Sequence, residues 1–219
     1  MLFRSVWTCF FDFLTTETLT VTMPLLFLLI LRYEKGELDD LKQEVKRILA
    51  GLFCWGISYT VMFAAKWLLS AILLGRQAFG EAMSAAGERI GGTVHLGNTN
   101  LDPEATGMQR FLGALIRNQG SLFPFHHTMR MGTAALAFLG VLALCLSLIY
   151  LFRSKKFEGR LLLLGLLLGA IPYLRYMVLE NHSYMHYFFT YRAQLVTITM
   201  LLFVTYELGI RNLLPDREK

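Results

Sequence analysis

The densest group of polar and aromatic side chains lies near the carboxyl-terminal end of the chain, between residues 173 and 192. Its ionisable members, tyrosines apart, are Arg175, Glu180, His182, His186 and Arg192. Cationic side chains in a water-poor site stabilise the negative charge that develops on a phosphate leaving group. A nearby carboxylate can deprotonate an acceptor hydroxyl, and Glu180 is the candidate catalytic base. The segment therefore predicts a site for a phosphate-bearing substrate.

Three further charged residues enter the same hypothesis because they lie in or beside apolar runs. Lys66 interrupts the run 48–74, whereas Asp12 and Glu17 lie at the start of the first apolar run. A charge in a membrane costs a few kcal/mol unless it faces protein or water. We expect Lys66 to bind substrate with the arginines and histidines, and Asp12 and Glu17 are alternative bases. The competing interpretation is that Lys66 and Arg192 only extend to lipid headgroups.

A metal site is a weaker interpretation of the two histidines. His182 and His186 are four residues apart and would share one helix face. Only Glu180, His126 and His127 are near enough in sequence to complete a ligand set. We expect neutral histidines that hold a hydroxyl or phosphate, with no metal and no cofactor. The tyrosines of the same segment are typical of an aromatic belt at a membrane surface.

The composition indicates where these residues must lie. Hydrophobic residues make up 55% of the 219 residues, charged residues only 17%, and the mean hydropathy is +0.48. Soluble domains carry roughly a quarter charged residues, so a soluble protein is excluded. The net charge of +5 comes from Lys and Arg between apolar runs, without the aromatic-interleaved stripe of a nucleic-acid-binding surface. The cysteines Cys9, Cys54 and Cys145 have no metal or disulfide spacing.

Five apolar runs predict an all-α, polytopic transmembrane helix bundle that forms a single domain over residues 1–219. The expected spans are 13–31, 48–74, 133–152, 161–179 and 193–210. We expect the first run to be retained, because acidic residues interrupt it and no signal-peptide cleavage site follows.

The connections between the runs predict the orientation. Lys and Arg gather in 32–47, 153–160 and 211–219, and short basic loops stay in the cytoplasm. The amino terminus is therefore expected outside and the carboxyl terminus inside. Segment 32–47 also has the pattern of a short amphipathic helix on the membrane surface.

The long segment 75–131 is then expected to be an extracytoplasmic helical loop. Residues 77–90 place apolar side chains on one face, and Asp102-Pro103 is a typical helix start. Two interpretations stay open for these helices, which either rest on the outer leaflet or form a lid over a site.

Two strings carry a resemblance to a known family. The first is Tyr-x3-Phe-x2-Lys-Trp, ending at Trp67, and the second runs from Asn181-His182-Ser183 to Phe-Thr-Tyr-Arg192. Over about residues 48–210, the chain resembles the carboxyl-terminal half of bacterial polytopic proteins related to the GT-C glycosyltransferases. The resemblance implies sugar transfer from a polyprenyl phosphate donor at the outer face of a bacterial cytoplasmic membrane, as part of cell-envelope chemistry. It also implies donor-binding roles for Lys66, His182, His186 and Arg192.

The chain departs from that family in having few spans and no acidic dipeptide after a first helix. We therefore expect an incomplete, glycosyltransferase-like protein whose missing amino-terminal half could come from a partner subunit. Its expected partners are membrane lipids and a lipid-phosphate-linked sugar, with no nucleic acid. The alternatives are a small permease or flippase component and a non-catalytic membrane assembly subunit. Whether the chain is an enzyme stays open.

Overall fold

The computed structural model describes residues 17–75, 106–123, 131–152 and 159–213, together with 77, 79–81, 83, 84 and 87. Every regular element in these residues is a helix. In chain order the elements are α2 (Leu19–Glu34), α3 (Leu41–Leu74), α5 (Gly107–Gly120), α6 (Met131–Phe152), α7 (Gly159–Val178), α8 (Glu180–Met185), α9 (Tyr187–Thr190), η1 (Tyr191–Gln194), α10 (Leu195–Leu208) and η2 (Ile210–Leu213). The prediction of an all-α fold is therefore confirmed.

Four stretches of the described chain are long and apolar enough to cross a membrane. They are Leu41–Leu74, Gly132–Phe152, Gly159–Val178 and Tyr187–Leu208. A bilayer core needs about 20 apolar residues in a helix, so the prediction of a polytopic membrane protein is confirmed. The helix α2 has 16 residues, and the span expected at 13–31 begins outside the described residues. The orientation of the termini stays a prediction.

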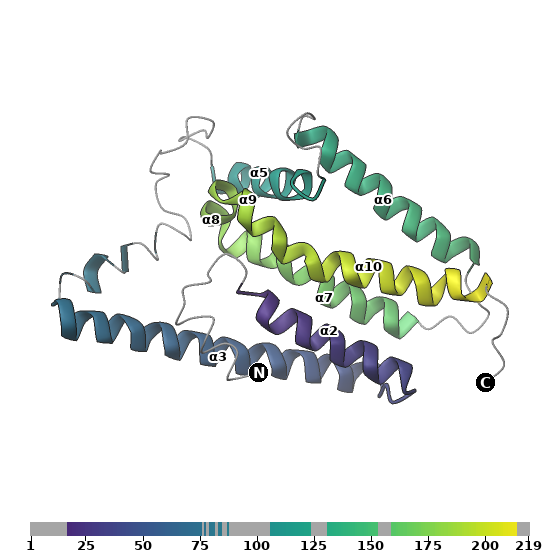
Figure 1. The fold of residues 1–219 in the computed structure, drawn as a ribbon, viewed down its shortest axis with the longest axis horizontal. Helices are drawn as coiled ribbons and strands as arrows, with labels where there is room; N and C mark the ends of the chain where they lie inside the picture. The colour runs from purple at the N-terminus through teal and green to yellow at the C-terminus, as the bar shows by residue number, and fades with distance from the viewer. Residues whose placement is uncertain are drawn as a thin grey trace.

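The centre of the bundle is the contact of α10 with α7 and α2, while α3 packs on α2 and α6 packs on α10 (Figure 1). Fully buried leucines of α7 meet Val196 and Met200 of α10. The close approach of these helices depends on Gly165, since a Cβ there would lie 2.6 Å from Cε of Met200. Small residues at helix contacts allow this close packing in membranes. Van der Waals contacts of this kind stabilise a bundle in lipid, where the hydrophobic effect does not drive helices together.

The two ends of the bundle differ. The short helices α5, α8 and α9 lie at one end, here called the α5 end, and the turn from α2 to α3 lies at the other, here called the loop end (Figure 1). The helix α5 packs on α6 and α8. It begins with a capping box, in which Thr106 and Gln109 bond each other's backbone N–H groups. The expected start at Asp102-Pro103 and most of the expected helix 77–90 lie outside the described residues.

The segment 32–47 is not a separate surface helix, so that prediction was wrong. The helix α2 runs on to Glu34, and α3 begins at Leu41 with Asp40 as its N-cap. Arg32 and Arg47 both bond the buried carboxylate of Glu44 and the carboxylate of Asp39. These ion pairs fix the turn at the loop end, and the amphipathic pattern belongs to the first turns of α3.

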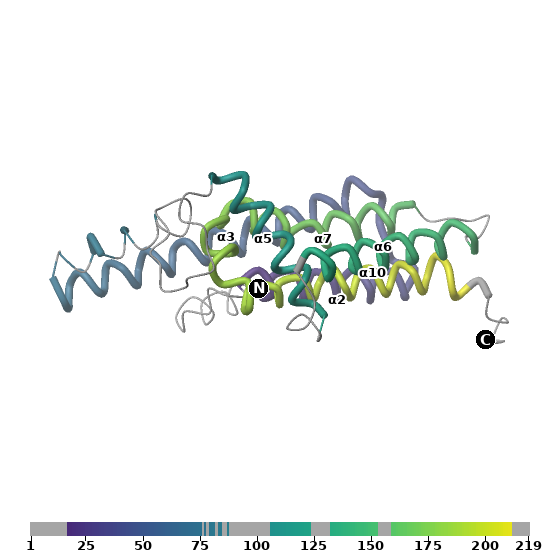
Figure 2. The backbone as a smooth tube through the Cα atoms, turned by 90° about the horizontal axis from the view of Figure 1, so that it is seen from above, coloured from purple at the N-terminus to yellow at the C-terminus, as the bar shows by residue number. Residues whose placement is uncertain are grey.

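The carboxyl-terminal half of α3 extends past α2, α7 and α10 at the α5 end (Figures 1 and 2). After Ser58, no described residue of α3 is buried. A row of aromatic rings four residues apart runs along this helix, from Trp55 through Tyr59 and Phe63 to Trp67. The second half of α3 is therefore an apolar surface that the rest of the described chain leaves open.

Candidate functional site

The polar centre of the α5 end is a buried ion pair between residues far apart in the chain. Arg175 of α7 donates from Nε to Oε1 of Glu17 at 2.5 Å and from a terminal nitrogen to Oε2 at 3.2 Å. The other terminal nitrogen donates to Oγ of Ser183 in α8 at 3.1 Å. Glu17 and Arg175 are only 4% and 5% exposed. A fork-to-fork pair of this kind is the strong, directional form of an ion pair.

This geometry changes what Arg175 and Glu17 can do. The guanidinium charge is balanced inside the protein, and both carboxylate oxygens of Glu17 accept bonds from it. A phosphate ligand of Arg175 or a base role for Glu17 would have to break this pair. The pair instead ties the segment before α2 to the end of α7, which is a structural role. The expected substrate role of Arg175 stays a prediction that this contact does not support.

A second polar network joins α5 to the segment after α7. The amide nitrogen of Asn118 donates to the carbonyls of Ala114 and Ser183, at 2.8 and 3.1 Å. Its oxygen accepts from the hydroxyl of Thr190 at 2.8 Å, and the hydroxyl of Tyr176 donates to the carbonyl of Thr190 at 3.0 Å. Asn118 and Thr190 are fully buried. Satisfied networks in a low dielectric fix one arrangement, so α5 is firmly attached to this end.

The other expected site residues of segment 173–192 lie around this network. Glu180 begins α8 and lies 3.8 Å from Nε of Arg110 in α5. His182 is buried and His186 half-buried, with their ring centroids 4.8 Å apart. Arg192 is exposed, and its guanidinium carbon lies 5.7 Å from the centroid of the Phe189 ring. The chain therefore gathers Glu180, His182 and His186 near α5.

Lys66 has a different position. It is half-buried on α3, in the half of the helix that extends past the bundle. Among the described residues, no group of three or more His, Cys, Asp or Glu could hold a metal ion. His126 and His127 lie outside the described residues. We expected five residues to line one recess: Lys66, Arg175, His182, His186 and Arg192. None of the five lines either of the two cavities described below. Their role in binding a ligand stays a prediction.

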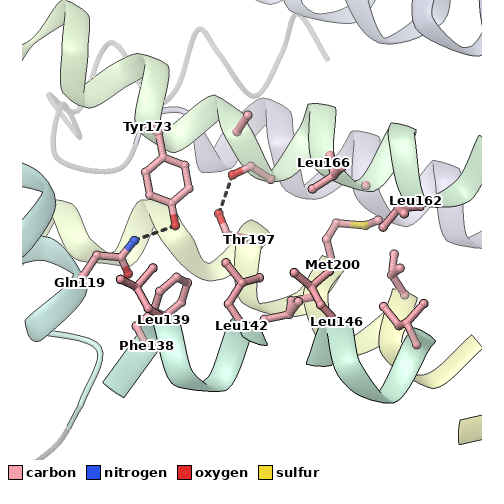
Figure 3. Close-up of a pocket in the computed structure, with 16 residues that line it drawn as sticks. Gln119, Phe138, Leu139, Leu142, Leu146, Leu162, Leu166, Tyr173, Thr197 and Met200 are labelled. Carbon is pink, nitrogen blue, oxygen red and sulfur yellow. Dashed lines mark hydrogen bonds between the residues drawn. The ribbon is translucent and has the colours of Figure 1, made fainter. Parts of the chain in front are cut away.

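The larger of the two cavities lies between α6, α7 and α10 (Figure 3). Its volume is about 360 Å³, within the range of small-molecule sites. Its walls are almost entirely apolar, with Phe138, Leu142 and Leu146 from α6, Leu162 and Leu166 from α7, and Met200 and Val204 from α10. Leu139 and Leu166 are more than half exposed at its edge. The cavity, here called the α6 groove, therefore opens toward the surroundings of the bundle.

Hydrogen-bonding groups lie at the α5 end of this groove. The amide nitrogen of Gln119 donates to the hydroxyl of Tyr173 at 2.9 Å (Figure 3). That hydroxyl donates to Oε1 of Gln194 at 3.3 Å. Thr197 donates to the carbonyl of Gly169 at 2.8 Å. The oxygen Oε1 of Gln119 is buried and has no hydrogen-bond partner among the described residues. Because Gln119 lines the groove, a rotation of its amide would offer this unmet acceptor to a donor from a ligand.

Sequence reasoning missed this groove. Its lining leucines have the same residue types as leucines that face lipid, so no pattern distinguishes them. The polar residues at its end offered the available signal, because Gln119 and Gln194 are amides next to apolar helices.

The fold and this site define the class of the chain, an all-α integral membrane protein of the helix-bundle type. Comparisons with protein-family models, with curated proteins and with solved structures gave no match.

Proposed function

We propose that this protein binds a membrane lipid in the α6 groove, with one hydrocarbon chain along the groove and the polar group of the lipid at Gln119 and Tyr173. The observation that carries the proposal is the combination of a long apolar cavity with an unmet hydrogen-bond acceptor at one end. Binding sites for small amphipathic molecules have this composition, mostly apolar with a few placed polar groups.

The groove is about as long as one leaflet is thick. From Leu162 to Tyr173 the lining follows α7 for roughly 16 Å at 1.5 Å per residue. The hydrocarbon core of a bilayer is about 30 Å thick, so the groove covers about half of it. A chain that enters at the α5 end would pass the middle of the membrane and approach the loop end, because Leu162 lies near the start of α7.

Selectivity must come from the polar end of the groove. Bilayer hydrocarbon is as apolar as leucine, so moving a chain from lipid into the groove gains little by itself. A hydrogen bond made inside a membrane contributes about 1–2 kcal/mol in model helices, which corresponds to a preference of roughly 5- to 30-fold. Because Oε1 of Gln119 is an acceptor, it selects a lipid whose polar group carries a hydroxyl or N–H donor.

A lipid-phosphate-linked sugar meets this requirement, because it has a long chain and many hydroxyl donors. Among the described residues, no charged side chain lines the groove. The phosphate would therefore rest at the membrane surface, and the sugar that it carries would fold back against the end of the groove, where a sugar hydroxyl would meet Gln119. In this form the proposal retains the lipid-binding part of the glycosyltransferase-like hypothesis, in a bacterial cytoplasmic membrane. A partner subunit, where one exists, would meet the open half of α3.

The test uses the protein in phosphatidylcholine nanodiscs and a polyprenyl-phosphate hexose with a photoreactive group near the end of its chain. Labelling should be reduced by the unlabelled polyprenyl-phosphate hexose and not by added phosphatidylcholine. Ala170→Trp places a large ring in the groove and should abolish most labelling. Gln119→Leu removes the acceptor. The concentration of unlabelled polyprenyl-phosphate hexose that is needed to reduce labelling should therefore rise by roughly 5- to 30-fold.

Leu163→Trp is the matched control, since Leu163 is exposed on the same helix but does not line the groove. It should label as the wild type does. Equal competition by phosphatidylcholine, or equal labelling of Ala170→Trp and Leu163→Trp, would contradict the proposal.

A further inference from the structure

The second cavity lies at the loop end, next to the end of the α6 groove that Leu162 lines. Its volume is about 250 Å³, and its lining is Tyr33, Glu34, Gly36, Leu38, Arg160 and Arg211. These residues come from one continuous stretch at the end of α2 and the turn into α3, from the start of α7, and from the segment η2 after α10. Three separate parts of the chain therefore build one polar pocket, here called the loop-end pocket.

The position of the pocket places it at the surface of a membrane. The helix α7 begins at Gly159 and the span that includes α10 ends at Leu208, both beside the pocket. Phospholipid phosphates lie at this depth, just outside the hydrocarbon core. Tyr33 provides an amphipathic ring of the kind found at membrane surfaces, and Leu38 provides an apolar wall for the first carbons of a lipid chain.

The arginines of the pocket are held by the protein at defined positions. Arg211 donates from one terminal nitrogen to the buried carboxylate of Glu207 at 2.5 Å, while its side chain stays 57% exposed. This hydrogen bond raises the pKa of the Arg211 guanidinium above its ordinary value, so Arg211 is charged at all ordinary pH values. Arg160 is exposed and donates to the backbone carbonyl of Asp39 at 3.1 Å. It lies in the first turn of α7, where the helix dipole favours an anion.

The charges of the pocket identify the kind of headgroup. Two guanidinium groups suit a phosphate, but Glu207 balances one of them and Glu34 adds a carboxylate to the lining. A purely anionic headgroup would meet this carboxylate at a cost. A headgroup with both a phosphate and an ammonium satisfies both kinds of charge, and a primary ammonium offers three N–H donors to a carboxylate.

We propose that the loop-end pocket binds the headgroup of a phosphoethanolamine-type phospholipid, with its phosphate on Arg160 and Arg211 and its ammonium on Glu34. This inference does not depend on the ligand in the α6 groove, because no described residue lines both cavities. The choline headgroup carries no N–H donor, and the glycerol headgroup carries no ammonium, so the pocket discriminates against both.

The experiment measures lipid retention by native mass spectrometry, with the protein in nanodiscs of equal parts phosphatidylethanolamine, phosphatidylglycerol and phosphatidylcholine. The wild type should retain phosphatidylethanolamine up to about fivefold above either of the others, because the phosphate contacts are common to all three lipids and one partly exposed ion pair, between the ammonium and Glu34, distinguishes them. Arg160→Gln should reduce the amount of all three lipids retained per protein, because each carries a phosphate. Glu34→Gln should reverse the order of phosphatidylethanolamine and phosphatidylglycerol, because the ammonium loses its partner and the anionic lipid loses a repulsion.

Lys46→Gln is the matched control, since Lys46 is an exposed cation at the same end that does not line the pocket. It should behave as the wild type. Soluble glycerophosphoethanolamine, added at the molar concentration of the lipid, should not displace the bound lipid. Equal retention of the three lipids by the wild type, an unchanged order in Glu34→Gln, or displacement by the soluble compound would overturn the proposal. The Glu34→Gln variant serves as its own reference, because only the ratio between lipids is compared, whereas the loss in Arg160→Gln is measured as lipid bound per protein against Lys46→Gln.

Discussion

Replacing Glu17 by Gln should destabilise the protein more than any other single change to a charged residue at the α5 end. The substitution keeps the size of the side chain but leaves the Arg175 guanidinium buried without a counter-ion. Removing one partner of a buried pair costs about 3–5 kcal/mol. For a chain of this size, about 1 kcal/mol lowers the melting temperature by 2–4 °C, so the expected decrease is roughly 6–20 °C.

The assay is thermal unfolding in one detergent, followed by intrinsic tryptophan fluorescence, for Glu17→Gln, Arg175→Met and the double variant. Because the two side chains bond each other directly, the double variant should be more stable than Glu17→Gln alone. The coupling should amount to about 0.5–3 kcal/mol, as for residues in direct contact. Arg192→Gln is the control for loss of an arginine at the same end, because Arg192 is exposed. It should change stability by less than about 0.5 kcal/mol.

Two results would refute this reasoning. A decrease no larger than that of Arg192→Gln would mean that Glu17 does not balance Arg175. Strict additivity in the double variant would mean that the two residues act separately. Arg175 would then be available for a phosphate, as the sequence hypothesis expected.

Two further predictions concern the packing of α5 and the surface of α3. Gly113→Val should release α5 from α8, because even a Cβ at Gly113 would lie 2.5 Å from the Tyr184 ring. Limited proteolysis should then cut residues 106–123 faster than in the wild type. An unchanged rate of cutting would contradict the close approach. A photoreactive amino acid at Leu69, which is 52% exposed on the open half of α3, should cross-link to a second polypeptide in native membranes if a partner subunit covers this surface. The same group at Leu163 is the control, and lipid adducts alone at both positions would exclude such a partner.

The helices were predictable because membrane spans depend on local composition. The apolar runs that contain Phe138, Leu164 and Val204 became α6, α7 and α10 within a few residues of the expected bounds. The segment 32–47 was misinterpreted for a physical reason. Its amphipathic period fits a surface helix and the first turns of a longer helix equally well, and the choice depends on ion pairs between Arg32, Arg47 and Glu44.

The candidate site was predictable only in part. Charged residues in apolar surroundings led to Arg175 and Glu17, and the structure places both at the polar centre of the α5 end. That they bond each other could not be predicted, because the contact joins residues 158 positions apart and no local pattern records it. The same limit applies to Asn118, whose partners Ser183 and Thr190 lie in another segment. The α6 groove was invisible because leucines that line a cavity match those that face lipid.

The central claim is that a lipid chain occupies the α6 groove, and mapping the photolabelled residues tests it most directly. After labelling with the polyprenyl-phosphate hexose described above, peptide mass spectrometry should locate the adducts in α6 and α7, at positions such as Leu142 and Leu166. The exposed half of α3, including Leu69, should carry little label. Adducts spread evenly over α3 and the outer faces of the bundle would show that the groove has no special affinity for lipid, and the account would be contradicted.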